Sequence, residues 1–200
     1  MEAQANVERP RKRLDPETRR GLILDGTAAL IISEGLTAVN MERVAREAMV
    51  SKALVYSYFG NQTALLSELL LREYRTFQRN SREAAKHVSG LESLVRVTTR
   101  VYLDHVAARG SLVQRLMMEP AIAAGLQEVE SADRMVTATF FADKIAAERG
   151  VDTARAYMAA QLLMGLTGTA GDYLVSAGAD ADEISPLVVS MIMASLDGLK

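Results

Sequence analysis

The stretch NMERVAREAMVSKALVYSYF, residues 40–59, decides how the rest of the chain is organised. It predicts two short helices that are separated by a tight turn at Met49. Asn40 is a candidate N-cap of the first helix, because its side-chain oxygen can accept a free backbone N–H of the first turn. Ser51 is a second N-cap candidate, and it opens a helix whose apolar residues recur at helical spacing as far as Phe59. This pattern is typical of a helix-turn-helix, whose second helix can enter the major groove of DNA.

Residues 15–70 resemble the N-terminal domain of the TetR family of bacterial transcriptional regulators. The resemblance is carried by Gly35 at the end of the preceding helix, by the pattern V-S-x-x-x-V-Y-x-Y-F that starts at Val50, and by Asn61 ahead of an apolar run. It implies an all-α protein in which a three-helix helix-turn-helix domain is joined by a long helix to a helical effector-binding and dimerisation domain over residues 71–200. It also implies a dimeric, sequence-specific DNA-binding regulator, and it identifies no effector.

The chain departs from the family pattern at several positions. Met49 stands where the family usually has Gly, and a turn that needs a positive φ would strain Met. Ala53 and Leu54 stand where the family usually has Gly and a small residue such as Thr. Tyr58 stands where the family often has His, and Gln62 replaces a Lys that commonly meets a phosphate.

Composition favours a soluble helical protein. Hydrophobic residues make up 49% of the chain and charged residues 24%, and only four prolines interrupt a sequence rich in good helix formers. There is no cysteine, which excludes disulfides and cysteine-ligated metals. Because neither a signal peptide nor an apolar run of about 18 residues is visible, we expect a cytoplasmic protein.

Positive charge is concentrated toward the N-terminus. Residues 1–119 hold 18 Lys and Arg against 14 Asp and Glu, whereas residues 120–200 hold 5 against 11. Residues 1–14 read as a basic disordered arm that includes Arg9, Arg11 and Arg13. This arm could contact DNA phosphates or a minor groove, and the alternative is a solvated tail.

Direction along the second helix divides its residues between core and DNA. Val55 is expected to face inward, whereas Lys52 can donate to guanine or phosphate and Leu54 can touch a thymine methyl. The tyrosines are expected to contact phosphates, with amphipathic packing as the alternative. The predicted DNA-contacting residues are Arg13, Asn40, Ser51, Lys52, Ala53, Leu54, Tyr56, Ser57, Tyr58 and Gln62.

Caps and breakers place the remaining helices. Asp15-Pro16 opens a helix that ends at Gly35, and Asn61 caps a long helix that bridges the two domains. Further on, Gly110 is expected to end one helix and Pro186 to open the last. With the pair in residues 40–59, the predicted total is about nine helices, over residues 15–34, 62–88, 91–108, 112–119, 126–148, 152–176 and 187–199.

The last two helices are apolar nearly all round, so we expect a partner to cover them. The economical partner is a second copy, which would form a four-helix interface about a two-fold axis. The predicted interface residues are Leu163, Leu166, Ala170, Val188, Met191, Ile192 and Ser195.

The middle helices are expected to enclose a small-molecule pocket, because they combine large apolar side chains with a few polar tips. The alternative is that most of these residues are ordinary core. The candidate lining residues are Tyr102, His105, Met117, Phe140, Phe141, Tyr157, Gln161 and Met164.

Three functions fit these patterns to different extents. The first is a dimeric repressor that binds an operator in double-stranded DNA and is released by a small hydrophobic or amphipathic effector. An enzyme has no support, since His87 and His105 lack metal-ligand spacing and no P-loop is present, and we expect no cofactor. A helical module that binds a small molecule or lipid without specific DNA contact would explain the C-terminal part, but not the helix-turn-helix.

Overall fold

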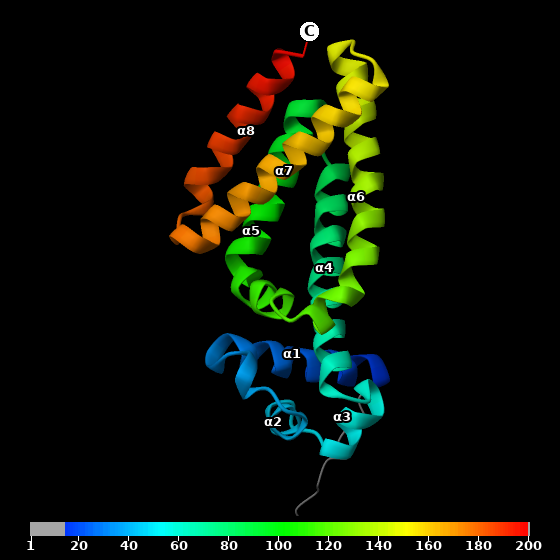
Figure 1. Ribbon diagram of the computed structural model, residues 1–200, viewed down its shortest axis with the longest axis vertical. Helices are drawn as coiled ribbons and strands as arrows, with labels where there is room; N and C mark the ends of the chain where they lie inside the picture. Colours follow the sequence, from blue (N-terminus) through cyan, green and yellow to red (C-terminus); the bar gives the residue numbers. More distant parts are fainter. Residues whose placement is uncertain (1–14, 200) are drawn as a thin grey trace, which may run out of the picture.

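The protein is seen here as a computed structural model that describes residues 15–199, so the predicted basic arm and Arg13 lie outside the described residues. All regular structure within this range is helical (Figure 1). It consists of eight α-helices and one short 3₁₀ helix: α1 (Pro16–Glu34), η1 (Leu36–Ala38), α2 (Met41–Glu47), α3 (Lys52–Phe59), α4 (Gln62–Lys86), α5 (Leu91–Met117), α6 (Pro120–Arg149), α7 (Thr153–Ala177) and α8 (Ala181–Asp197).

Side-chain caps begin the helices where the sequence predicts them. The Asp15 carboxylate accepts the backbone N–H of Thr18 at 2.9 Å, and Pro16 follows as the first helical residue of α1. Asn61 caps α4 by accepting the N–H of Ala64, also at 2.9 Å. Each cap satisfies backbone donors that the first helical turn leaves free.

Three predicted boundaries in the second half of the chain are wrong. α5 runs unbroken through Gly110, where a Cβ atom would lie 2.7 Å from Cγ2 of Val175, so this glycine permits close packing on α7 rather than ending a helix. α6 begins at Pro120, six residues before the expected start, because a proline is tolerated in the first turn. α8 begins at Ala181 because Asp180 caps it, which leaves Pro186 inside the helix.

The helices surround two hydrophobic cores, which we call the lower core and the upper core. The lower core joins α1–α3 and the first half of α4 to Leu112, Leu116, Ile122 and Leu126, from the end of α5 and the start of α6. The upper core lies among α5, α6, α7 and α8. We call α1, α2, α3 and the start of α4 the head. In Figure 1, α4 rises from the head and passes between α5 and α6. Helix α4 runs without a break across residues 70 and 71, where the sequence places the boundary between the two domains.

Candidate nucleic-acid interface and effector cavity

The helix-turn-helix forms as the sequence predicts. The Asn40 side chain accepts the N–H groups of Glu42 and Arg43 at 3.1 and 2.9 Å, and Ser51 Oγ accepts the N–H of Leu54 at 3.2 Å. Val55, on the inner face of α3, is completely buried in the lower core. The two caps and this inner face therefore fix how α3 is presented.

The turn between α2 and α3 keeps the geometry that normally calls for glycine. Met49 has a φ of +52°, and within residues 15–199 it is the one non-glycine residue with positive φ. Its side chain is 92% exposed, so no packing offsets the strain of this conformation. The N–H of Val50 donates to the carbonyl of Ala45 at 2.9 Å, which closes the end of α2.

A close helix crossing, which the sequence analysis missed, supports the turn from behind. A Cβ atom at Gly26 of α1 would lie 3.2 Å from the backbone nitrogen of Ala48. A larger residue at position 26 would therefore push α1 away from the end of α2. A single glycine in a helical pattern signals such a contact only weakly, because glycine also occurs in helices without one.

The outer face of α3 is small and polar. Lys52, Ala53 and Ser57 are exposed, Tyr56 is 45% exposed and Leu54 is half-buried. Lys52 Nζ lies 3.6 Å from Oε2 of Glu42, an exposed pair that DNA phosphates can replace. The Ser57 hydroxyl donates to the Leu54 carbonyl at 2.8 Å. This face can therefore offer one cation, two hydroxyls and a methyl group to a groove.

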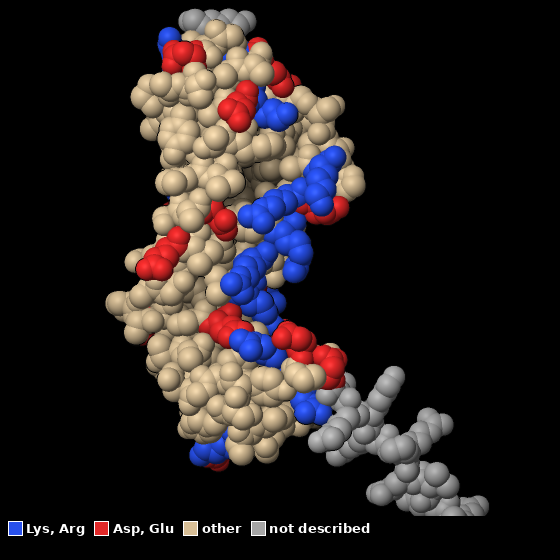
Figure 2. All heavy atoms as spheres, turned by 90° about the vertical axis from the view of Figure 1, so that its right-hand side faces the viewer, with Lys and Arg blue, Asp and Glu red and all other residues tan. Residues whose placement is uncertain are grey.

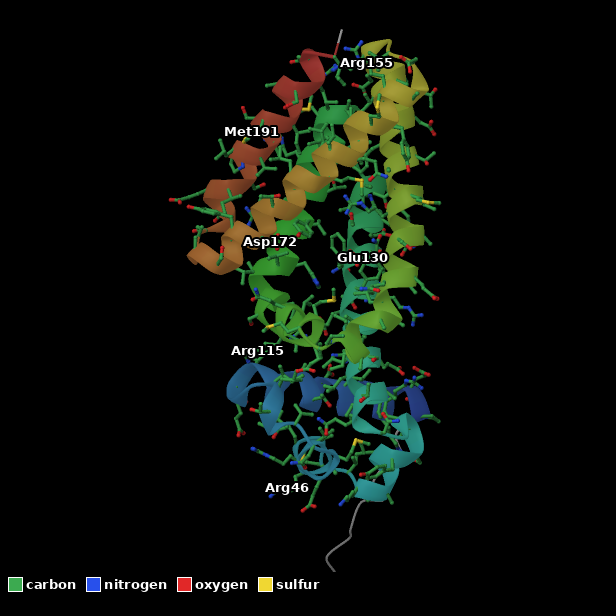
Figure 3. All side chains as sticks on the ribbon, viewed as in Figure 1. Arg46, Arg115, Glu130, Arg155, Asp172 and Met191 are labelled. Carbon is green, nitrogen blue, oxygen red and sulfur yellow. The ribbon has the colours of Figure 1, made fainter. Side chains whose placement is uncertain are left out.

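Residues beside α3 divide between packing and exposure. The half-buried Tyr58 packs against the lower core, with its ring centroid 6.2 Å from that of Phe59. Gln62 is exposed as the first residue of α4. Arg46, which the sequence analysis placed only on the polar face of its helix, lies on α2 at the bottom of the head in Figure 3 and has no ion pair within residues 15–199. It is a further candidate for phosphate contact.

Two adjoining cavities, which share part of their lining, lie above the head. The inner cavity has a volume of about 280 Å³ and the outer cavity about 690 Å³, close to the range of small-molecule sites. Phe77 and Gln78 of α4 line both, as do Phe141 and Met164. The inner cavity is also walled by the fully buried Leu91.

The predicted pocket residues fall into two groups. Tyr102, Phe141 and Met164 line the inner cavity, and Phe140 lines the outer one. The others line neither cavity. His105 stacks on Phe77 at 5.5 Å, Gln161 donates to the Tyr157 hydroxyl at 3.1 Å, and Met117 is partly exposed at the end of α5. The contribution of α4 to both cavities was missed, because its amphipathic pattern indicates only a packed helix.

Burial shifts the pKa values of two tyrosines and one histidine near the cavities. Desolvation raises the pKa of Tyr102, and the negative charges of Asp172 and Glu130 raise it further. Desolvation also raises the pKa of Tyr74 to about 12. It lowers the pKa of His105, with a smaller opposing effect from Glu73. The two tyrosines are therefore neutral hydroxyls at neutral pH.

A buried carboxylate lies between the cavities and the head. Glu73 of α4 is 3% exposed, and its oxygens lie 3.2 Å from a guanidinium nitrogen of Arg72 and 3.3 Å from Nε of Arg109 on α5. Arg72 also contacts α1, through the Asp25 carboxylate at 2.7 Å and the Gly21 carbonyl at 3.4 Å. These contacts, which we call the Glu73 cluster, connect α5, α4 and α1.

α7 and α8 expose a row of large apolar side chains. Met158, Leu162 and Tyr173 of α7 and Leu187 and Met191 of α8 are each at least 45% exposed. Figure 3 shows Met191 on the outer side of α8.

Only part of the predicted dimer set lies on this surface. Met191 and Ser195 are exposed, and Leu163 and Leu166 are half-buried. Ala170, Val188 and Ile192 instead pack into the upper core, because α8 covers α5 as well as α7. An available contact face therefore excludes these three residues.

Two negative findings concern the described part of the chain. No helix within residues 15–199 is both long enough and apolar enough to span a membrane. The same residues contain no group of three His, Cys, Asp or Glu side chains arranged to hold a metal ion.

The fold and the head are similar to those of known regulators. Residues 23–69 match the family described as bacterial regulatory proteins, tetR family. Over 175 residues the chain is 26% identical to the HTH-type transcriptional activator FasR of Mycolicibacterium smegmatis. The match covers 84% of this chain and 78% of that protein.

Solved structures extend the likeness to the whole fold. The fatty acid degradation regulator FadR of Bacillus halodurans has a TM-score of 0.73 and 17% identity, covering 90% of this chain and 96% of that one. FadR of Bacillus subtilis, solved in complex with stearoyl-CoA, has a TM-score of 0.69 and 17% identity. The match covers 86% of this chain and 96% of that one. At these identities the structures show a shared fold. With the family match over residues 23–69 and the helix-turn-helix geometry, the chain carries the DNA-binding domain of the TetR family of transcriptional regulators.

Proposed function

We propose that the protein is a homodimeric repressor whose complex with operator DNA is released by a small amphipathic effector. One observation carries the proposal: the single helix α4 begins directly after the recognition helix α3 and lines both cavities near its other end. With 25 residues, α4 is roughly 37 Å long. A ligand that moves its upper end therefore also moves the head.

In the DNA-binding state, α3 of each protomer enters a major groove. Lys52 leaves Glu42 to donate to a phosphate or to guanine, and Ala53 can contact a thymine methyl. Tyr56 and Ser57 fix the register through phosphate oxygens. The start of α4 at Gln62 presents backbone N–H groups toward the same backbone.

Two recognition helices must lie about 34–36 Å apart to enter successive major grooves on one side of DNA. A homodimer meets this requirement if the exposed apolar faces of α7 and α8 pack together across a two-fold axis. The exposed Leu162, Leu187 and Met191 support this arrangement, because an apolar surface of this kind commonly marks a protein interface.

An amphipathic effector agrees with the cavities and with the related structures. The inner cavity combines apolar walls with hydroxyl groups, including those of Tyr102 and Thr99. FadR of Bacillus subtilis, which shares this fold, was solved with stearoyl-CoA.

The Glu73 cluster provides a route from the cavities to the head. Phe77 lines both cavities and contacts the ring of His105, which lies one helical turn before Arg109. A ligand beside Phe77 would shift α5 against α4 and change the pairing of Glu73, and with it the contacts of Arg72 on α1. Release from DNA then requires that the ligand bind this second arrangement more tightly than the DNA-binding one.

Fluorescence anisotropy with DNA from the region upstream of the protein's own gene tests the proposal. Specific binding should survive a scrambled competitor duplex at two salt concentrations, with two chains or more per site. A long-chain acyl-CoA should then lower DNA affinity at least tenfold. Equal binding to both duplexes, vanishing as salt rises, would reject sequence-specific recognition. DNA affinity that increases with the ligand would indicate an effector-dependent activator instead.

A further inference from the structure

We infer that the effector carries a long apolar chain on a phosphorylated headgroup, with the chain in the inner cavity and the phosphates in the outer one. The inference rests on the proposed function, because it takes the two adjoining cavities as the effector site. It adds the charge of the ligand, its orientation, and the residues that recognise its head.

The inner cavity suits an apolar chain better than a headgroup with several negative charges. Its walls include the buried Leu91, Val95 and Ile145, whose side chains offer no hydrogen bonds. This lining holds one carboxylate, that of Glu130 on α6 (labelled in Figure 3), and one cation, Arg134, which also lines the outer cavity. A headgroup with several negative charges would meet one carboxylate and one cation there, but four cations in the outer cavity.

The outer cavity has the opposite character. Arg82 and Lys86 of α4 and Arg134 and Lys144 of α6 line it, against the single carboxylate of Glu148. That carboxylate already accepts the backbone N–H of Leu91 at 2.7 Å. Figure 2 shows Lys and Arg side chains gathered in a band along one face of the molecule. Four cations on two helices therefore face a space that holds little negative charge.

Two of these cations are available to a ligand. Within residues 15–199, Lys144 pairs with no carboxylate, and its Nζ lies 5.9 Å from the centroid of the Phe140 ring. Arg134 donates only to the neutral amide of Gln161, at 3.3 Å. The other two form exposed pairs, Arg82 with Asp133 at 3.6 Å and Lys86 with Glu83 at 2.8 Å, which exchange readily for a stronger anion.

The number and spread of these cations favour phosphates over a single carboxylate. One carboxylate could pair with one or two cations on a single helix, whereas phosphates on an extended head could engage α4 and α6 together. Arg and Lys are the side chains that bind phosphate oxygens best. The outer cavity, at about 690 Å³, is also more than twice the size of the inner one, as a large headgroup requires.

Calorimetric titration of the full-length protein, without DNA, tests the inference with three probes that share a C16 chain. Palmitoyl-CoA and palmitoyl-lysophosphatidate carry phosphates, whereas palmitate carries only a carboxylate. We expect at least one phosphorylated probe to bind about tenfold or more tightly than palmitate. Whichever phosphorylated probe binds more tightly identifies the source of the headgroup. Palmitate binding as tightly as both would overturn the inference.

A pair of double variants separates the cavity from general positive charge. K86Q/K144Q removes two cavity cations. It should lower the affinity for the phosphorylated probe about tenfold and change the affinity for palmitate by less than about twofold. R75Q/R79Q removes two exposed arginines of α4 that do not line either cavity, and should leave both ligands within twofold. Equal losses in the two double variants would mean that only net charge matters, and would overturn the assignment.

DNA anisotropy with the same probes keeps the two proposals apart. Tight binding of palmitoyl-CoA that K86Q/K144Q weakens about tenfold, with no effect of palmitoyl-CoA on DNA affinity, would support the headgroup site and reject effector control of DNA binding. Release of DNA by palmitate as readily as by palmitoyl-CoA would support effector control and reject the phosphate site.

Discussion

Glu73 of α4 and Arg109 of α5 form an ion pair of 3.3 Å, in which the carboxylate is buried and the guanidinium is about one-third exposed. The same carboxylate holds Arg72, which reaches α1. Burying a charge costs solvation free energy, and only charged partners that stay in place can offset this cost. The pairing of Glu73 therefore ties the relative positions of α4 and α5 to the position of the head.

Removing Arg109 should destabilise the fold. Arg109→Met leaves the Glu73 carboxylate buried with Arg72 alone, and we expect a loss of about 1–3 kcal/mol, below the full cost of a buried unpaired charge because Arg109 is partly exposed. Urea unfolding measures the change. Arg96→Met, which breaks an exposed pair with Glu92 on the same helix, is the matched control and should cost less than about 0.5 kcal/mol. Similar losses in both variants would contradict the role given to the Glu73 cluster.

Protonation of His105 should make the protein less stable in mild acid. Burial lowers its pKa in the folded state below the unfolded value of 6.5, so the unfolded chain takes up the proton first. The stability that depends on neutral His105 is therefore complete above about pH 6.5 and is lost as the pH falls through the folded pKa. Urea unfolding measures the free energy of unfolding at pH 7.5 and 5.5. Its decrease between the two pH values should be smaller for His105→Gln than for the wild type. His87→Gln, which removes an exposed histidine at the end of α4, should lose as much stability as the wild type.

Met49→Gly should stabilise the head by up to about 1 kcal/mol. Glycine adopts a φ of +52° without the steric cost that a side chain incurs, although it gains freedom in the unfolded chain. Thermal unfolding measures the effect. Met118→Gly is the control, because Met118 is also exposed but has a φ of −67°, and it should be neutral or destabilising. A destabilising Met49→Gly would show that the side chain contributes more than its exposure suggests.

Lys52→Gln should weaken operator binding about tenfold and reduce the dependence on salt by about one charge, if Lys52 contacts a phosphate. Loss of a guanine contact would instead relax specificity at one base pair. Anisotropy titrations at several salt concentrations distinguish these outcomes. Lys86→Gln, far along α4, should leave DNA affinity unchanged in the absence of ligand. No change in Lys52→Gln would exclude this residue from the interface.

Leu162→Asp should convert a homodimer into monomers. Its side chain is 75% exposed on α7, and a charge buried in an apolar interface would be desolvated without a partner. Light scattering after gel filtration measures the mass. Met135→Asp replaces a similarly exposed apolar residue of α6 and should remain dimeric. The same mass for both variants would place the dimer contact elsewhere.

Local signals predicted the helix-turn-helix well. The caps at Asn40, Ser51 and Asn61 depend on side chains that reach backbone groups two or three residues away, so the sequence contains the whole interaction. The inward direction of Val55 and Phe59 follows from helical spacing alone, and both are buried.

Signals that depend on distant segments could not be interpreted in the same way. In isolation Gly110 indicates the end of a helix, yet Val175 of α7 packs against it. Val188 and Ile192 lie on an apolar helix, and only the position of α5 decides that they face the protomer's own core. The cavity side of α4 likewise required knowing that α5, α6 and α7 supply the other walls of the cavities.

The composition of the lower core has a consequence for building chimeric regulators. Leu112, Leu116, Ile122 and Leu126 belong to the core of the head, although they lie more than forty residues beyond its last helix-turn-helix residue. A hybrid that joins this head to another effector domain at residue 70 would replace all four side chains with unmatched ones. Grafting residues 112–126 together with residues 15–70 would keep the donor head's packing intact, so the natural unit of exchange is discontinuous in sequence.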